Sequence, residues 1–365
     1  MMPKLSDVCI KGTSNVAQKD LDARNGAYPI YGASGFIKNV DFYHQDKPYI
    51  AIVKDGAGVG RVMQLPAKSS VIGTMQYILP NDGVSVEYLA YALEHMNLAK
   101  YYLGAAIPHI YFKDYCSEPL PNHTPEEQAN ISHVLGLVSN LIFLRKQQLS
   151  KLDELVKSRF IELFGMPGSD DFGWGLMPLG SACHINPKKS QDGRLVSGLE
   201  VSFVPMPAVT ECGEIDATTI KEYDEVKTGF TYFTENDVLF AKITPCMENG
   251  KGAVARGLYN GIGFGSTEFH VLRPISGKTN PYWLYMLTAF PQFREDAANN
   301  MTGSAGQRRV PASFLENYRV SVPPMELQEQ FAAFVEQIDK SKFEIQKSLE
   351  KLEILKKSLM QQYFG

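Results

Sequence analysis

The sequence of 365 residues lacks the features that mark membrane-spanning, disulfide-stapled and zinc-binding proteins. No apolar run reaches the roughly eighteen residues that a transmembrane helix needs, and the N-terminal MMPKLSDVCIKG has no apolar core of a secretory signal. The five cysteines are widely scattered and form no C-x-x-C pair. Neither a disulfide framework nor a metal site is therefore indicated. We expect free thiols, a cytoplasmic location and no contact with a membrane.

Catalytic and nucleotide-binding motifs are also missing. No H-E-x-x-H, nucleophile elbow or Walker sequence occurs. The glycines Gly56, Gly58 and Gly60 lack the G-x-G-x-x-G spacing and precede a β-like run, so they are interpreted as turn glycines. The triplet at 280–282, Asn-Pro-Tyr, lacks one proline of the N-P-P-Y motif of adenine N6-methyltransferases. It is expected to begin a helix, with Asn280 as the N-cap. We predict no catalytic residue and no metal ligand in this chain.

The chain has no excess of positive charge. Its 36 basic and 40 acidic residues give a formal net charge of −4, and no segment is basic. Neutralisation of phosphates supplies most of the non-specific affinity for DNA. Tight binding of nucleic acid by this chain alone is therefore not expected.

An internal repeat is the strongest positive signal. KLDELVKSRFIELFG, ending at Gly165, and KLEILKKSLMQQYFG, ending at Gly365, share seven identical positions at an offset of 200 residues. The match extends upstream, where Gln128 lies opposite Gln328 and Ile131 opposite Phe331. The chain is therefore predicted to contain two copies of one unit, a globular domain followed by a long helix.

Four segments follow from this repeat: globular domains at 1–124 and 166–324, a central spacer helix at 125–165 and a C-terminal spacer helix at 325–365. Each globular segment has short β-like runs separated by glycine and proline, and ends with one helix candidate. This pattern predicts two similar α+β domains, each with a strongly curved sheet.

The two helical segments carry apolar residues at alternating spacings of three and four. This narrow seam is typical of a coiled coil. No proline occurs between residues 126 and 166 or after residue 324, so each helix is expected to form a rod of roughly 60 Å. The predicted seam residues are Ile131, Leu135, Val138, Ile142, Leu149, Leu152, Val156, Phe331, Val335, Ile338, Ile345, Leu349, Leu352 and Leu359.

The globular domain between the two helices favours an antiparallel pairing within the chain. The expected fold is therefore pseudo-twofold, with a globular domain at each end of an antiparallel coiled coil. The alternative is that each helix packs only on its own globular domain.

One loop stands out as a candidate binding element. The stretch NNMTGSAGQRRVPASFLENYRVSVPP presents Gln307, Arg308 and Arg309 from a loop rich in glycine and serine. Arginine and glutamine form paired hydrogen bonds with base edges, and arginine also binds phosphates. The corresponding stretch of the first half, YYLGAAIPHIYFKDY, offers His109 and Lys113. The alternative is a solvated loop that happens to carry basic residues.

Several of these stretches resemble one known family. MTGSAGQRRVPASFLENYRVSVPPMELQEQF is similar to the junction between the target-recognition domain and the helical region in specificity subunits of Type I restriction–modification enzymes. YPIYGASGFIKNVDFY, IAIVKDGAGVG and DVLFAKITPCMENGKGAV resemble sequences within those domains. The order of domains and helices matches over essentially the whole chain. The first half departs from the pattern, because GAAIPHIYF replaces the loop with Thr-Gly and Gln-Arg.

The resemblance implies a non-catalytic subunit that recognises a bipartite sequence in double-stranded DNA. The expected partners are two modification subunits, which methylate adenine at N6, and restriction or translocase subunits. S-adenosylmethionine, magnesium and ATP are expected on those partners, and this chain is expected to hold no cofactor. Two other classes remain as alternatives: a coiled-coil scaffold that binds only proteins, and a DNA methyltransferase that acts alone.

Ten polar residues are the predicted DNA contacts, although each one alone is more often a phosphate contact or a surface residue. Thr267 and Glu268, aligned with Thr74 and Met75, are interpreted as strand positions. The ten predicted contacts are Lys54, Arg61, Gln76, His109 and Lys113 in the first domain, and Lys242, Arg256, Gln307, Arg308 and Arg309 in the second.

Overall fold

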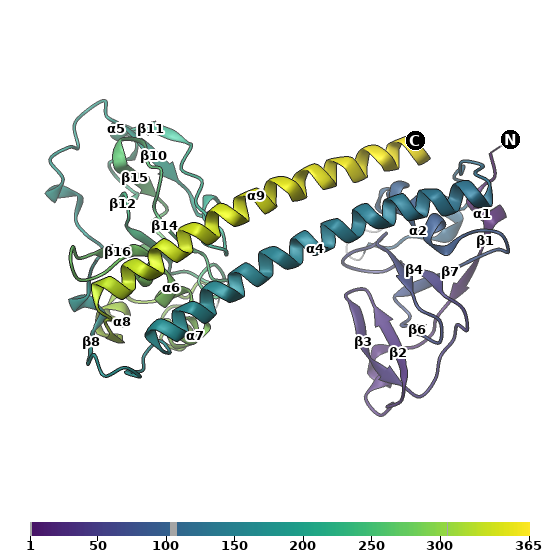
Figure 1. Cartoon of the computed structure of the whole chain (residues 1–365), viewed down its shortest axis with the longest axis horizontal. Helices are drawn as coiled ribbons and strands as arrows, with labels where there is room; N and C mark the ends of the chain where they lie inside the picture. Colours follow the sequence, from purple (N-terminus) through teal and green to yellow (C-terminus); the bar gives the residue numbers. More distant parts are fainter. Residues whose placement is uncertain (1, 103–107, 305) are drawn as a thin grey trace. The chain divides into compact units, whose positions relative to one another are not determined.

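A computed structural model describes residues 2–102, 108–304 and 306–365. It contains the two long helices that the apolar seams predict, α4 (Pro125–Phe164) and α9 (Met325–Phe364), each of 40 residues (Figure 1). The chain forms two compact units, the first of residues 1–147 and 345–365 and the second of residues 148–344. Each unit therefore contains a globular domain together with one end of each long helix.

The globular domain of the first unit contains two small sheets. An antiparallel sheet has the strand order β1-β7-β4-β5, and a second sheet has the order β3-β2-β6, with β2 parallel to β6. The strands are β1 (Cys9–Thr13), β2 (Tyr28–Gly32), β3 (Gly35–Val40), β4 (Tyr49–Val53), β5 (Val62–Leu65), β6 (Ser70–Val71) and β7 (Met75–Pro80). The helices beside them are α1 (Leu5–Val8), η1 (Gln18–Leu21), α2 (Val86–His95), η2 (Leu98–Tyr101) and α3 (Phe112–Tyr115).

Strand β4 forms the centre of the first domain, because all five of its residues are buried. Alternate side chains of a strand point to opposite faces of the sheet. Ile50 and Ile52 accordingly pack in the cluster that includes α2, whereas Tyr49, Ala51 and Val53 pack in a cluster with residues of the second sheet. A strand buried on both faces has no room for alternation of polar and apolar residues, which explains its continuous apolar sequence.

The globular domain of the second unit contains the same kinds of sheet. One antiparallel sheet has the order β14-β13-β16-β9, a second has the order β11-β10-β15-β12, and β17 pairs with β8. The strands are β8 (Leu176–Pro178), β9 (Cys183–Ile185), β10 (Glu200–Val204), β11 (Ile220–Glu222), β12 (Thr231–Thr234), β13 (Val238–Ala241), β14 (Gly252–Val254), β15 (Ile262–Gly265), β16 (Phe269–Pro274) and β17 (Arg319–Ser321). The helices are η3 (Leu179–Ser181), η4 (Lys189–Gln191), η5 (Met206–Ala208), α5 (Tyr223–Val226), η6 (Tyr259–Gly261), α6 (Pro281–Ala289), α7 (Pro291–Asn299) and α8 (Ala312–Asn317).

The strand orders show the internal repeat directly. The order β1-β7-β4-β5 in the first domain corresponds to β9-β16-β13-β14 in the second, and the parallel pair β2/β6 corresponds to β10/β15. The first domain therefore has two small sheets, and the second has the same two together with the β17–β8 pair, instead of the single strongly curved sheet that the sequence predicts. The strands are only two to six residues long, and turns such as the one between β6 and β7 interrupt the chain before one sheet can continue into the other.

A buried glutamine joins each long helix to the domain that precedes it. The Gln128 side chain accepts a hydrogen bond from the Ser85 backbone N–H at 3.1 Å, and Gln328 accepts one from Asn280 at 2.8 Å. Ser85 and Asn280 are the N-caps of α2 and α6, and each caps its helix with its own side chain. The N-cap role that the sequence predicts for Asn280 is therefore confirmed. The repeated glutamine fixes the start of the long helix against the domain helix.

The long helices pair in opposite directions within each unit. In the second unit, Phe331 near the start of α9 packs on Phe160 and Phe164 near the end of α4, with ring centroids 5.6 and 5.4 Å apart. In the first unit, the start of α4 shares a buried cluster with the end of α9, and Lys146 pairs with Glu353 at 2.9 Å. The alternative in which each helix packs only on its own domain is therefore wrong.

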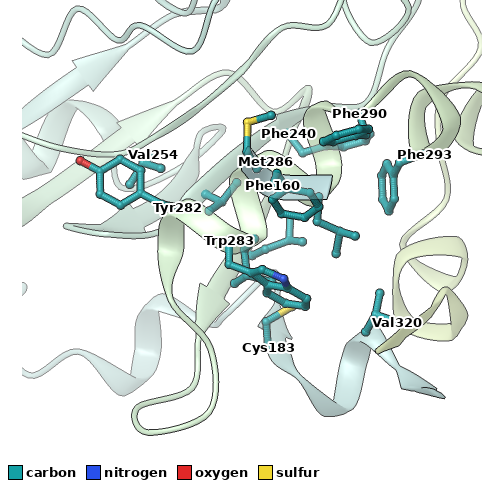
Figure 2. Packing of buried hydrophobic residues seen from close by; sticks show 14 of the residues in the cluster. Phe160, Cys183, Phe240, Val254, Tyr282, Trp283, Met286, Phe290, Phe293 and Val320 are labelled. Atoms are coloured by element: carbon teal, nitrogen blue, oxygen red, sulfur yellow. The ribbon is translucent and has the colours of Figure 1, made fainter. Parts of the chain in front are cut away.

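The predicted seam lies on the covered side of both helices. Its members are all buried or half-buried, and Leu135 and Phe331 have no exposed surface. In the second unit the seam joins the core of the domain, where Phe160 from α4 packs 5.1 Å from Phe290 beside the residues of α6 (Figure 2). Helix pairing and domain packing are therefore parts of one hydrophobic core.

Two leucines on α4 provide a matched test of the seam. Leu135 is fully buried, whereas Leu137, two residues later on the same helix, is 54% exposed. We expect Leu135→Ala to lower the free energy of unfolding by about 2–4 kcal/mol, because it leaves a cavity in the core. Leu137→Ala should change it by less than about 0.5 kcal/mol. Urea titrations followed by circular dichroism measure both effects, and equal losses for the two variants would contradict this account of the seam.

Candidate nucleic-acid interface

The same set of backbone hydrogen bonds holds one loop in each domain, and each loop lies shortly before the long helix. In the second domain, the loop of residues 306–310 (the second loop) is bound to the end of β13. The Val310 N–H donates to the Lys242 carbonyl at 2.9 Å, and the Thr244 N–H donates to the Arg308 carbonyl at 3.0 Å. The Lys242 N–H in turn donates to the Glu268 carbonyl, just before β16, at 2.9 Å.

The loop of residues 108–111 in the first domain (the first loop) is held in the same way at the end of β4. Ile110 donates to the Lys54 carbonyl at 3.0 Å, and Gly56 donates to the Pro108 carbonyl at 2.9 Å. Lys54 donates to the Thr74 carbonyl at 3.0 Å. The two loops are therefore equivalent elements of the repeat, and His109 occupies the position of Arg309.

The side chains on the second loop form ion pairs with nearby carboxylates. Arg309 donates from Nε and Nη2 to both carboxylate oxygens of Glu268, at 2.9 and 2.8 Å for the shortest contacts. These hydrogen bonds lower the pKa of Glu268 and raise the pKa of Arg309. Burial lowers the pKa of the neighbouring Lys242. With Arg308 and its partner Glu248, the cluster has three basic and two acidic groups and is locally positive.

A buried arginine supports the turn that carries Glu248. Arg294 is 7% exposed and donates to the backbone carbonyls of Met247 at 3.1 Å, Gly250 at 3.2 Å and Thr288 at 2.6 Å. Burial lowers the pKa of Arg294 to about 10, so the guanidinium is still charged at neutral pH. The hydrogen bonds from Arg294 therefore fix the turn that carries Glu248. The Glu248 carboxylate in turn accepts a hydrogen bond from Arg308 Nη2 at 3.2 Å.

The first loop has a different set of side chains on the same backbone support. His109 Nδ1 forms a hydrogen bond with the Asp55 carboxylate, and the His109 ring lies 4.1 Å from the Tyr111 ring. Lys113 is exposed and lies over Tyr111, 5.2 Å from the ring centroid. An imidazole, a phenol and an ammonium group are thus presented where the second loop presents two guanidinium groups. The predicted departure GAAIPHIYF falls partly on residues 103–107, which lie outside the described residues.

The structure brings most of the predicted contacts to these two loops. Lys54 and Lys242 support the loops through backbone hydrogen bonds. His109 lies on the first loop, and Lys113 follows that loop by two residues. Gln307, Arg308 and Arg309 lie on the second loop. Arg61 is exposed and lies on the β4–β5 hairpin, where it donates to the Ala33 carbonyl at 2.8 Å.

Two of the predicted contacts lie elsewhere. Gln76 is 1% exposed and donates a hydrogen bond to the Tyr115 hydroxyl, so it belongs to the core of the first domain. Arg256 lies over the Tyr282 ring at 4.3 Å and pairs with Glu336 of α9 at 3.4 Å. Arg256 therefore joins the second domain to the long helix and does not contact the loop cluster.

The carboxylates of the cluster were not predicted from the sequence. The sequence pattern predicts a strand position for Glu268, but Glu268 lies in the turn before β16, where its side chain reaches Arg309. Asp55 follows Lys54 directly and reaches His109. Asp55 lies two residues after β4, and Glu268 lies directly before β16. An acidic residue at the edge of a predicted central strand is therefore the sequence signal that could have identified both.

Another equivalent pair lies beneath the loops. His270 corresponds to Gln76, because each is the second residue of its strand, β16 or β7. His270 is 5% exposed, and its Nε2 lies 2.8 Å from the Val310 carbonyl, while Asn186 Nδ2 lies 3.0 Å from its Nδ1. This arrangement suits a neutral ring that donates from Nε2. Burial lowers the pKa of His270.

The described part of the chain contains neither a metal-binding cluster nor a membrane-spanning helix. No group of three or more histidine, cysteine, aspartate or glutamate side chains there could hold a metal ion. Within the same residues, no helix combines the length and apolar character needed to cross a bilayer.

Comparison with known proteins gives matches to one family. The family model described as "Type I restriction modification DNA specificity domain" matches residues 1–154 and 173–356. The specificity subunit of the Type I restriction enzyme EcoEI from Escherichia coli is 43% identical over 155 residues, which are 42% of this chain and 25% of that subunit. The EcoAI specificity subunit from the same organism is 43% identical over 160 residues, 43% of this chain and 26% of that subunit. The chain thus aligns with about a quarter of the length of these relatives.

Solved structures match over the whole chain. The S subunit of a Type I restriction–modification system from M. genitalium has a TM-score of 0.58 and 14% identity, covering 100% of this chain and 96% of that one. A second structure, described under the words "structural basis underlying complex assembly and conformational transition of the type I R-M system", has a TM-score of 0.51 and 16% identity. The match covers 100% of this chain and 98% of that one. At these identities the likeness establishes the fold alone.

The low pKa of His270 predicts an acid-dependent loss of stability that a single substitution removes. Because the histidine stays neutral in the folded protein, protons bind preferentially to the unfolded chain as the pH falls below about 6.5. Stability from this group is therefore complete above that pH and declines below it, towards the lower pKa of the folded state. His270→Gln, which introduces the residue found at the equivalent position 76, should lose less stability between pH 7.5 and 5.5 than the unmodified protein. Urea midpoints at the two pH values test this, and identical pH dependence would contradict it.

Proposed function

Because the chain belongs to the Type I restriction–modification DNA specificity family, we propose that it is the sequence-recognition component of such an enzyme and binds a DNA target of two separated half-sites. The observation that carries the proposal is that equivalent backbone hydrogen bonds hold one loop in each domain, while the side chains on the two loops differ. A bipartite target with two different halves needs two domains of the same fold that present different chemical groups. The first loop presents His109 with Asp55, and the second presents Arg309 with Glu268.

The loop side chains suit the major groove, where the four base pairs show distinct patterns of hydrogen-bond donors and acceptors. Arg309 and His109 are the proposed base-reading groups. Lys54, Lys113 and Arg308 are the proposed phosphate contacts, because single charged groups fix the position of a protein on DNA without reading sequence. Gln307 and Arg61 are included as further contacts. Gln76 and Arg256 are left out, since one is buried and the other is paired with α9.

The chain is proposed to act with two modification subunits that methylate adenine at N6 and bring S-adenosylmethionine, and with restriction subunits where these are present. Helix α4 carries exposed leucines outside the seam that support such docking. Leu137, Leu141 and Leu144 are 54%, 46% and 44% exposed and recur at spacings of four and three, so they share one face of the helix. An apolar stripe of this kind marks an interaction surface.

The proposal predicts that this chain alone binds DNA weakly. With a net charge of −4 and acidic partners beside its loop cations, it releases few counterions from DNA. Electrophoretic mobility shifts should therefore show specific binding only when the modification subunits are added. Tight, sequence-specific binding by the isolated chain would contradict this division of roles.

The proposal also predicts that the length of the paired helices sets the gap between the half-sites. Seven residues inserted after Gln147 and seven after Lys351, near the Lys146–Glu353 pair, keep both apolar seams in phase. Each helix gains about 10 Å, so the gap should lengthen by about three base pairs. Sequencing of methylated sites in cells that express the variant with its modification subunits measures the gap directly.

The matched control for the helix insertion places seven residues in α4 alone, which mismatches the two seams and should abolish methylation. An unchanged gap in the double-insertion variant with intact activity would remove the spacing role from the helices.

A further inference from the structure

On the second loop, hydrogen bonds with Glu268 fix the orientation of the Arg309 guanidinium group. We infer that Arg309 reads a guanine in the half-site bound by the second domain, and that Glu268 is the residue that positions it. This inference rests on the proposed function and names the base class recognised at that site.

The N–H donors of the Arg309 guanidinium group have two partners among the described residues, Glu268 and the Gln307 carbonyl. One side of the planar guanidinium, formed by Nε and Nη2, is bound to Glu268, with contacts of 2.9 Å from Nε and 2.8 Å from Nη2. Nη1 donates to the Gln307 carbonyl at 3.3 Å. Since a guanidinium group has five N–H donors, one donor each on Nη1 and Nη2 remains. We take the Gln307 bond to use the Nη1 hydrogen on the Cδ side, so that the two remaining donors point outward side by side.

Two parallel donors at the end of an arginine match the major-groove edge of guanine, which offers two acceptors, O6 and N7. Adenine offers one acceptor beside an amino donor, and a second guanidinium N–H facing that amino group would be left without a partner. An unpaired polar group in an interface is costly. The free end of Arg309 therefore discriminates between purines, provided that its orientation is held.

Glu268 supplies that orientation. Its carboxylate accepts from both Nε and Nη2, so rotation of the guanidinium plane would break two charge-assisted hydrogen bonds. The Glu268 side chain is 24% exposed and the Arg309 side chain 41% exposed. The carboxylate is thus the more buried member and the guanidinium the more accessible one.

Arg308 provides the contrast within the same loop. Among the described residues, its guanidinium group contacts Glu248 at 3.2 Å, and its side chain is 45% exposed. This single hydrogen bond fixes the guanidinium plane less firmly than the bidentate contact of Arg309, so Arg308 suits a phosphate contact better than a base edge. The two neighbouring arginines are therefore assigned different roles by the geometry of their carboxylate partners.

The test is to sequence methylated sites in cells that express the full chain with its modification subunits. We expect a guanine in one half-site of the unmodified protein's target. Arg309→Ala should reduce the preference for that guanine over other bases by roughly 10- to 100-fold, while the other half-site and the gap stay unchanged. Arg308→Ala, the matched control, should lower methylation at all sites without changing base preference.

Two conservative variants separate recognition from folding. Arg309→Lys keeps the charge but loses the paired donors, so it should also lose the guanine preference. Glu268→Gln keeps the shape of the side chain but weakens the bidentate contact, and should lower the guanine preference while thermal unfolding changes little. If the Arg309→Ala protein fails to fold, the lysine variant carries the test.

The outcomes distinguish this inference from the proposed function. No bipartite methylation with the unmodified protein would overturn the proposed function itself. Bipartite methylation in which the Arg309 variants keep the full base preference, or a target without guanine in the affected half-site, would overturn only the inference about Arg309.

Discussion

The position of each candidate DNA-binding loop depends on backbone hydrogen bonds at the end of one central strand, β4 or β13. Strands β4 and β13 are buried along their whole length, so the main-chain groups just beyond their last residues are fixed in position. Lys54 and Lys242 stand at these points and bond through their backbone to both the neighbouring strand turn and the loop. The loop is thereby positioned by main-chain hydrogen bonds, and its side chains are free to differ between the domains.

The long helices extend this rigidity beyond the sheets. Each domain contacts the first turns of its own following helix through a buried glutamine, Gln128 or Gln328. Each also contacts the last turns of the other helix: Phe364 lies 5.3 Å from the Tyr88 ring in the first unit, and Phe164 joins the core of the second. The similar helix endings seen in the sequence are thus explained, because each ending packs on the equivalent domain helix, α2 or α6.

The sequence predicted the helices far better than the loops. Forty residues without proline and a seam of regular spacing leave few alternatives for a helix pair, so the antiparallel packing could be predicted from periodicity and chain order. The sheets are less regular, since strands such as β6 and β9 have two or three residues, too few for a periodic pattern. Their separation into several small sheets in each domain could not be predicted in this way.

The loop cluster illustrates the same limit for the candidate site. The arginines of the second loop were conspicuous because they lie together in the sequence, whereas Glu268 is 41 residues away from Arg309 and becomes its neighbour only through strand pairing. Gln76 looked like a binding residue by composition, but it is the second residue of β7 and its side chain points into the core. Local sequence identifies which chemical groups are present, and the register of the strands decides which of them meet.

One small difference between the loops shows how much freedom their residues have. Thr244 accepts a hydrogen bond through Oγ1 from the Arg308 N–H at 3.2 Å, whereas the first domain has a glycine and a proline at the equivalent positions, Gly56 and Pro108. Proline has no N–H to donate and glycine has no hydroxyl to receive one, so the two residues of the first loop match each other. Gly56 also has a φ of 81°, a backbone conformation that favours glycine. Repertoires of altered specificity built on this scaffold should accordingly vary these two positions together, and should also change each loop cation together with its carboxylate partner.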